Sequence, residues 1–109
     1  MQKHSLKYRK KKSESYRLIT RLYNFIRNNP DNIIFKKIFR DETGYYDPDT
    51  ENIVLDYRKD FIPTLIHEFI HHIYPDLKEK DVCKKEQKIM SVLSLQQFRN
   101  IMKLLTHHL

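Results

Sequence analysis

Two histidines and a glutamate are spaced so that one turn of helix would bring them to a single metal ion. His67 and His71 are four residues apart, so on a helix their imidazoles share one face. Neutral imidazole nitrogens are good zinc ligands, and catalytic zinc usually keeps three protein ligands and a water molecule. Glu68 flanks the pair, where its carboxylate can take a proton from water that zinc has activated. The spacing predicts a Zn²⁺ site with Glu68 as the general base.

A third ligand is required, and acidic residues downstream can supply it. Glu86 stands between Val82 and Ile89 in a stripe spaced for one face of a helix. A carboxylate in a core-facing stripe is costly unless it is paired with a neighbouring lysine or binds a metal. We therefore expect Glu86 to be the third ligand. Glu79 is the alternative, although its position three residues after Asp76 is also explained by a helix-capping pair.

The elements that must position these residues follow from capping residues, prolines and apolar spacing. We expect a helix after Ser13 that breaks at residues 28–31, and a strand-like segment over residues 32–39. Gly44 is expected to mark a turn, and residues 45–57 to form a hairpin around strong turn residues. Three further helices are expected: residues 61–73 capped by Asp60, residues 77–93 capped by Asp76 and Glu79, and a last helix capped by Ser94 and Gln97.

The stretch from Gly44 to Leu93 resembles the zincin metallopeptidases, in particular a minimal gluzincin-like form. The matching residues are Ile53-Val54-Leu55-Asp56, Pro63-Thr64-Leu65-Ile66-His67-Glu68-Phe69-Ile70-His71-His72, and Glu86. In that family a strand hairpin precedes the active-site helix, and a glutamate on the following helix completes the zinc site. The resemblance implies zinc-dependent hydrolysis of peptide bonds, with a peptide or protein substrate. We expect it to bind as an added strand at the exposed edge of the hairpin ending at Tyr57.

The expected fold class is α+β and zincin-like. It comprises a small antiparallel β-sheet, an N-terminal helix, the active-site helix with the His-Glu-x-x-His motif, and two C-terminal helices. The chain has 109 residues, which is the size of a single domain. We expect residues 1–12 to form a basic flexible arm and residues 13–109 to form the metallopeptidase domain.

Charge and cysteine content bear on partners and compartment. The 21 Lys and Arg residues exceed the 14 acidic residues, giving a net charge of +7, and the segment 7–12 is especially basic. That basic N-terminal arm is either a solvated tail or a contact for nucleic acid. The single Cys83, the lack of an apolar segment after the basic N-terminus and the lack of a long apolar stretch predict a cytoplasmic protein without membrane contact. Two other functions stay open: a non-catalytic zinc-binding regulatory module, and a nucleic-acid-associated protein that uses the arm.

Overall fold

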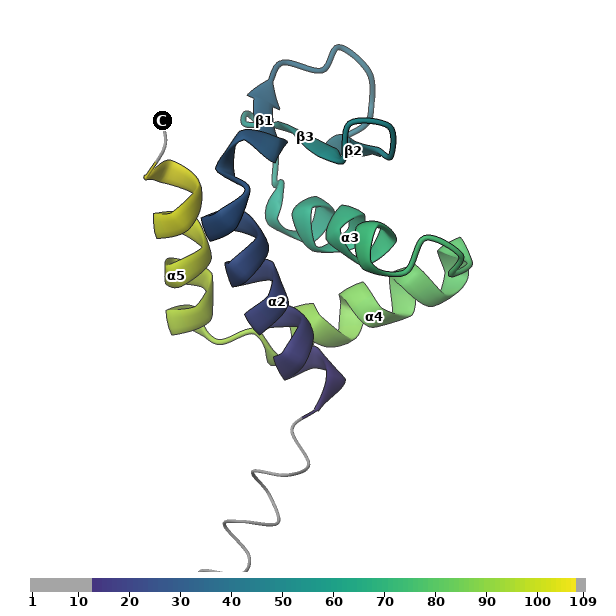
Figure 1. The fold of residues 1–109 in the computed structure, drawn as a ribbon, viewed down its shortest axis with the longest axis vertical. Helices are drawn as coiled ribbons and strands as arrows, with labels where there is room; N and C mark the ends of the chain where they lie inside the picture. The colour runs from purple at the N-terminus through teal and green to yellow at the C-terminus, as the bar shows by residue number, and fades with distance from the viewer. Residues whose placement is uncertain (1–12, 108–109) are drawn as a thin grey trace, which may run out of the picture.

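The computed structural model describes residues 13–107, and the predicted basic arm lies outside the described residues. Four α-helices, one short 3₁₀ helix and three strands make up the described part (Figure 1). In chain order they are α2 (Glu14–Asn28), η1 (Pro30–Asn32), β1 (Ile33–Lys36), β2 (Gly44–Asp47), β3 (Asn52–Asp56), α3 (Ile62–Ile73), α4 (Glu79–Val92) and α5 (Leu95–Thr106). None of the helices in residues 13–107 is long and apolar enough to cross a membrane. The fold is thus mixed α and β, with the predicted N-terminal helix, motif helix and two closing helices.

The sheet is mixed, and the prediction of an antiparallel sheet is wrong for β1. β2 and β3 form the expected antiparallel hairpin, with Tyr45 opposite Val54. β1 runs parallel to β3, with Phe35 opposite Leu55, so the strand order is β1-β3-β2. The reason is topological. β2 runs opposite to β1 and does not pair with it, and the hairpin then reverses the chain again. β3 therefore runs in the same direction as β1 and lies between β1 and β2. The free edges of the sheet therefore belong to β1 and β2.

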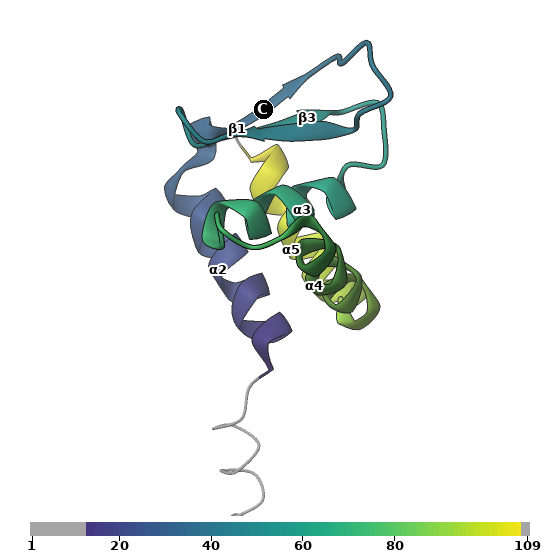
Figure 2. The same ribbon diagram turned by 90° about the vertical axis from the view of Figure 1, so that its right-hand side faces the viewer.

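The sheet lies across one end of the helical layer, and its inner face packs on α3 (Figures 1 and 2). Alternation along β3 directs Ile53 and Leu55 into the core, and both are fully buried. α3 contributes one wide apolar face, and α2, α4 and α5 close the other side. The buried helix residues of this core are Leu18, Ile19, Leu22, Ile26, Ile62, Leu65, Ile66, Phe69, Ile70, Val82, Ile89, Ile101 and Leu105. The apolar face of α3 is buried in this core. The orientation of the helix is therefore fixed, and the side that carries His67 and His71 faces α4.

Helix starts agree with the sequence at two places. The Ser13 side chain accepts a hydrogen bond from the Tyr16 amide at the start of α2. Ser94 and Gln97 form the predicted capping box at the start of α5, with each side chain bonded to the other's backbone amide. These two caps fix where α2 and α5 begin.

Two predicted caps are wrong. α3 begins after Phe61 rather than after Asp60, and no side chain in the described structure caps it. α4 begins at Glu79 with Lys78 at the N-cap position, again without a side-chain cap, so Asp76 and Glu79 form no capping box. Glu79 does not reach back to the backbone because its carboxylate contacts histidines of α3 instead.

Candidate metal centre

The packing of α3 against α4 brings both motif histidines to the first turns of α4. His67 and His71 lie one turn apart on α3, with ring centroids 5.0 Å apart and an interplanar angle of 66°. Both rings are largely buried, with side-chain exposures of 15% and 26%. The predicted placement of the two imidazoles on one helix face is therefore correct.

Glu79, the first residue of α4, faces the ε nitrogens of both histidines. Its Oε1 atom lies 2.6 Å from His67 Nε2, and its Oε2 atom lies 2.8 Å from His71 Nε2. Ligand atoms of these three residues all lie within 4.8 Å of one another. Partial desolvation opposes ionisation of Glu79, but the charges of His67 and His71 outweigh it and lower the pKa of the carboxyl. Two nitrogens and an anionic oxygen converging in this way are a donor set that suits zinc.

Glu86 lies at the other side of the His67 ring. Its Oε1 atom is 3.0 Å from His67 Nδ1, and its side chain is 23% exposed. An Nδ1–H group that donates to Glu86 leaves Nε2 as the nitrogen with a free electron pair. The structure thus brings Glu86 to the motif, as the sequence predicts, but to the nitrogen that faces away from Glu79 and His71.

Carboxylates contact both nitrogens of the His67 ring, and these two contacts indicate whether a cation suits the site. A neutral imidazole carries one N–H group, so it cannot donate to both Glu86 and Glu79. Contacts of 3.0 Å at Nδ1 and 2.6 Å at Nε2 are therefore both hydrogen bonds only if the ring is protonated, and a cation bound by Nε2 and the Glu79 carboxylate would remove the need for that second proton. A histidine that binds zinc through one ring nitrogen usually donates the N–H group of its other nitrogen to a carboxylate. The residues present fit a bound zinc ion.

The spacing of residues in the sequence also places Glu79 on the helix face that carries Glu86. Glu79, Val82 and Glu86 are spaced by three and four residues, so all three lie on the stripe that singles out Glu86. Cys83 also lies beside this stripe, with its Sγ atom 3.9 Å from Glu79 Oε1. The sequence alone does not separate a metal-binding function of Glu79 from a capping one, because its position three residues after Asp76 also fits a capping pair.

Glu68, the predicted general base, lines a cleft of about 320 Å³ in front of the motif. The cleft is bounded by the start of β2, the segment before it, and the facing sides of α3 and α4. Its lining residues are Asp41, Glu42, Thr43, Gly44, Pro63, Thr64, His67, Glu68 and Glu86. Burial raises the pKa of the Glu68 carboxyl, and the neighbouring histidines act in the opposite direction. A half-buried carboxylate next to His67 and open to a cleft is placed to exchange protons with a bound molecule.

Gly44 lines this cleft and allows β2 to lie close to α3. A Cβ atom there would lie 2.4 Å from the Val54 carbonyl oxygen and 2.9 Å from Thr64 Cγ2. The prediction that Gly44 marks a turn is wrong, since it is the first residue of β2. The Thr43 and Thr64 hydroxyls share a hydrogen bond at the same contact. Close packing, and not a turn, accounts for the glycine here.

His72, next to the motif, belongs to a different contact. Its Nδ1 atom lies 2.8 Å from the Tyr46 hydroxyl, and its ring packs 4.9 Å from Phe25. This arrangement ties the β2 strand and α2 to the back of α3. His72 therefore positions the motif helix and points away from the Glu79 contact.

The described part of the chain thus brings His67, His71, Glu79 and Glu86 into one cluster, and His67, Glu68 and Glu86 also line the adjacent cleft. Comparison with known proteins adds no relative, because the chain matches no protein-family model, no curated protein and no solved structure.

Proposed function

We propose that the chain is a zinc-dependent metallopeptidase in which His67, His71 and Glu79 hold the metal. The observation that carries the proposal is the convergence of two ε nitrogens and the Glu79 carboxylate within 4.8 Å. A zinc ion held by these three protein ligands would keep a position for water or substrate, as catalytic sites do. In this proposal Glu79 replaces Glu86 as the third ligand, since Glu79 faces both histidines.

Glu86 then acts as the positioning residue of His67. By accepting a hydrogen bond from Nδ1, it holds the ring in one orientation and keeps Nε2 unprotonated. The burial of Glu86 supports this function, because a half-buried carboxylate is stable only with a polar partner. Its anionic charge also makes the imidazole a stronger donor to a cation.

Glu68 is the proton carrier of the proposed reaction. Bound zinc supplies the Lewis acidity that activates water for attack and polarises a peptide carbonyl. Glu68 accepts the proton of the attacking water and delivers it to the departing amine nitrogen. Its position on the cleft wall, one residue from His67, supports this function, as does the raised pKa of its carboxyl.

A peptide or protein substrate would lie along β2. β3 is the central strand, so the exposed edge of the hairpin that ends at Tyr57 is the edge of β2. β2 has the free edge on this side, and its first residue, Gly44, lines the cleft beside His67 and Glu68. An extended peptide added to β2 would pass the cleft with its backbone hydrogen-bonded to the strand.

The test of the proposal combines metal content with hydrolysis. Purified wild-type protein is expected to bind about one zinc ion per chain, and His67→Ala to bind none, by elemental analysis after dialysis. Glu68→Gln is expected to retain the zinc and lose hydrolysis of fluorescein-labelled casein, because it removes only the proton carrier. Wild-type protein that takes up no zinc would refute the metal site, and an active Glu68→Gln variant would refute the mechanism. Zinc uptake without any hydrolysis by wild type would favour the non-catalytic zinc module.

A further inference from the structure

The outer face of the sheet, opposite α3, carries a cation and an aromatic ring. Ile53 and Leu55 of β3 point into the core, so Val54 and its neighbours across the strands point outward. Lys36, at the end of β1, and Tyr45, on β2, both lie on this outer face. The Lys36 Nζ atom is 5.5 Å from the centre of the Tyr45 ring. Both line a pocket that shares only Glu42 with the lining of the metal cleft.

The segment 37–43, between β1 and β2, passes the end of β3, where a buried aspartate holds it. Asp56 is fully buried, and its Oδ2 atom accepts hydrogen bonds from the Ile38 amide at 2.9 Å and from Arg58 at 2.8 Å. Lys59 Nζ donates to three backbone carbonyls of the segment, those of Ile38, Arg40 and Glu42. A segment with this many charged hydrogen bonds has a fixed shape before any ligand arrives.

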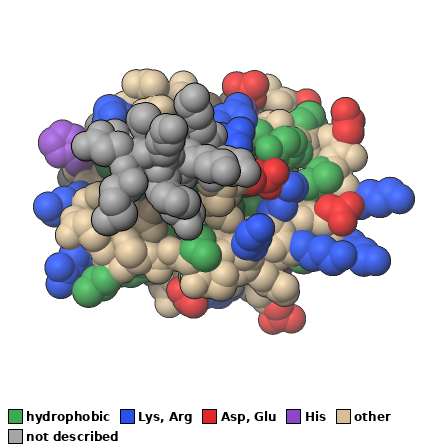
Figure 3. Space-filling view, turned by 90° about the horizontal axis from the view of Figure 1, so that it is seen from below, with side chains coloured by type: hydrophobic (Ala, Val, Ile, Leu, Met, Phe, Trp, Pro, Cys, Tyr) green, Lys and Arg blue, Asp and Glu red, His purple; other side chains and the backbone are tan. Residues whose placement is uncertain are grey.

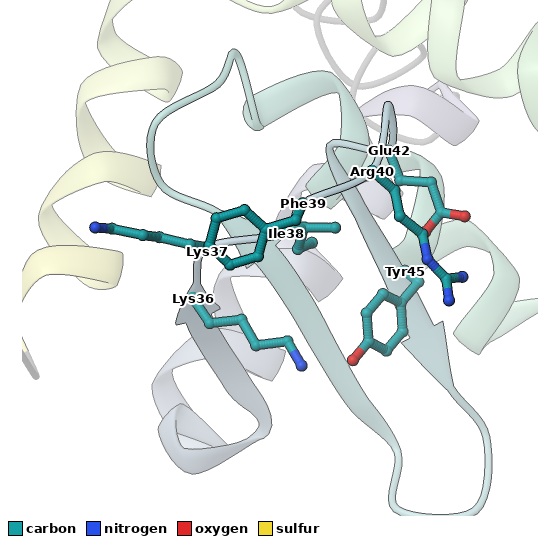
Figure 4. Close-up of a pocket in the computed structure, with 7 residues that line it drawn as sticks. All are labelled: Lys36, Lys37, Ile38, Phe39, Arg40, Glu42 and Tyr45. Carbon is teal, nitrogen blue, oxygen red and sulfur yellow. The ribbon is translucent and has the colours of Figure 1, made fainter.

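That fixed shape presents the Phe39 ring to solvent. Phe39 is 87% exposed, and the Arg58 guanidinium lies over its ring at 5.5 Å. The pocket beneath and beside the ring has a volume of about 590 Å³, and its lining residues are Lys36, Lys37, Ile38, Phe39, Arg40, Glu42 and Tyr45. In Figure 4 Lys36 and Tyr45 reach toward each other below Phe39, Arg40 is drawn on the Tyr45 side, and Lys37 extends the other way. One face of an aromatic ring is thus open above a cationic hollow.

The positive charge of this pocket is not neutralised nearby. Within residues 13–107, Lys36, Lys37 and Arg40 take part in no ion pair, and Glu42 is the single acidic residue in the lining. The end of the molecule opposite the sheet differs, because Lys and Arg side chains are interspersed there with Asp and Glu (Figure 3). The pocket therefore presents a local positive field beside an open aromatic face.

We propose that this pocket binds single-stranded nucleic acid. A base stacks on the open face of Phe39, and the flanking phosphates contact Lys36 and Arg40. The exposed ring favours a nucleic acid over an acidic peptide, since carboxylates need cations but gain nothing from an aromatic platform. A hollow of this shape admits a splayed base, which a paired duplex does not offer. The site does not depend on the metal, because none of its lining residues is a proposed zinc ligand.

The experiment measures binding of a fluorescein-labelled deoxythymidine dodecamer by fluorescence anisotropy, with the full chain in EDTA at low salt. Wild type is expected to bind, and Phe39→Ala to bind about 5- to 100-fold more weakly through loss of one stacked base. Phe39→Tyr keeps an aromatic face and is expected to bind about as tightly as wild type. Phe39 is almost wholly exposed, so these variants are expected to melt at the wild-type temperature.

Charge variants separate this site from general attraction to a basic protein. Lys36→Ala and Arg40→Ala are each expected to reduce the salt dependence of binding by about 0.7 in the log–log slope, because each removes one phosphate contact. Lys88→Ala, an exposed lysine on α4 with the same charge change, is the control and should leave the slope unchanged. Absence of binding by wild type overturns the proposal, as does wild-type affinity in Phe39→Ala. A labelled hexaglutamate is measured in the same way. If it binds as tightly as the dodecamer and Phe39→Ala weakens its binding too, the proposal is overturned in favour of an acidic peptide.

Discussion

Glu79 and Glu86 occupy opposite sides of one imidazole, and their functions are separable at the level of single atoms. Glu79 contacts Nε2 of His67 and also His71, whereas Glu86 contacts only Nδ1 of His67. A ligand contributes a direct bond to the metal, but an outer carboxylate contributes through the orientation and basicity of the ring. Removal of each charge should therefore cost zinc affinity to a different extent.

We predict that Glu79→Gln weakens zinc binding by more than the 10- to 100-fold expected for an outer partner, and that Glu86→Gln falls within about that range. Zinc affinity is measured by competition with a chromophoric chelator. Asp76→Asn removes an exposed charge just before α4 and serves as the control, with affinity unchanged. A greater loss in Glu86→Gln than in Glu79→Gln would restore Glu86 as the third ligand.

Asp56 is a second residue whose ionised form the fold requires. Hydrogen bonds from Arg58 outweigh the desolvation of burial, and with the Ile38 amide they hold the pKa of the Asp56 carboxyl well below its ordinary value of 3.8. A lowered pKa means that the unfolded chain binds a proton more readily than the folded one. The stabilisation is then complete above the ordinary pKa and is lost as pH falls below it toward the folded value.

We predict that the stability of wild type in EDTA falls as pH decreases below about 4, and that Asp56→Asn is less stable at neutral pH with a flatter decline. Urea unfolding at a series of pH values measures this. Asp41→Asn, in the same segment but exposed, is the control and should follow wild type. Parallel pH profiles for Asp56→Asn and wild type would show that Asp56 is not the titrating group.

At the level of elements, the contact of β2 with α3 sets the distance between the substrate edge and the motif. Gly44 permits this contact, since a Cβ atom would meet the backbone of β3 and the side chain of Thr64. We predict that Gly44→Ala lowers stability by about 1–3 kcal/mol and reduces hydrolysis, while zinc affinity is unchanged because all proposed ligands lie on α3 and α4. Thermal unfolding, peptidase assay and zinc titration measure the three effects. Unchanged stability would mean that the strand moves aside at no cost.

Elements whose information is local were predictable from the sequence. The apolar spacing around His67 and the capping box of Ser94 with Gln97 both depend on neighbours within one or two turns of helix, and the structure confirms them. The parallel pairing of β1 with β3 was not predictable, because the residues of β1 do not specify which strand they pair with. The contacts of Glu79 with His67 and His71 are not predictable from its neighbours in the sequence for a related reason: both histidines lie on another helix.

At the scale of the whole molecule, the two proposed sites occupy neighbouring regions that share one segment. Glu42 lines both the metal cleft and the cationic pocket. Its carbonyl is one of the three that Lys59 fixes, so the wall between the sites is held by the same charges that shape the pocket. A nucleic acid in the pocket would then lie near a peptide on β2, and the two ligands are expected to compete only where they meet this segment.

The metal ligands also join two parts of the fold, because the proposed zinc atom would be held by α3 and α4 together. α3 carries the sheet, and α4 packs on α2, where Lys85 forms an ion pair with Glu14. A ligand that binds only the folded chain stabilises it by about 2.7 kcal/mol at a concentration one hundred times its dissociation constant. For a domain of this size that corresponds to a rise in melting temperature on the order of 10 °C.

We predict such a rise when zinc is added to the metal-free wild-type chain, measured by circular dichroism with and without EDTA. His71→Ala should show no rise, because one of the two α3 ligands is gone, while its metal-free melting temperature stays near that of wild type. His72→Ala is the matched control: it removes a neighbouring imidazole outside the metal site and costs the Tyr46 hydrogen bond, yet it should retain the zinc-dependent rise. Zinc that stabilises His71→Ala as much as wild type would place the metal elsewhere on the chain, and α3 and α4 would then be joined by packing and by the contacts of the α3 histidines with Glu79 and Glu86.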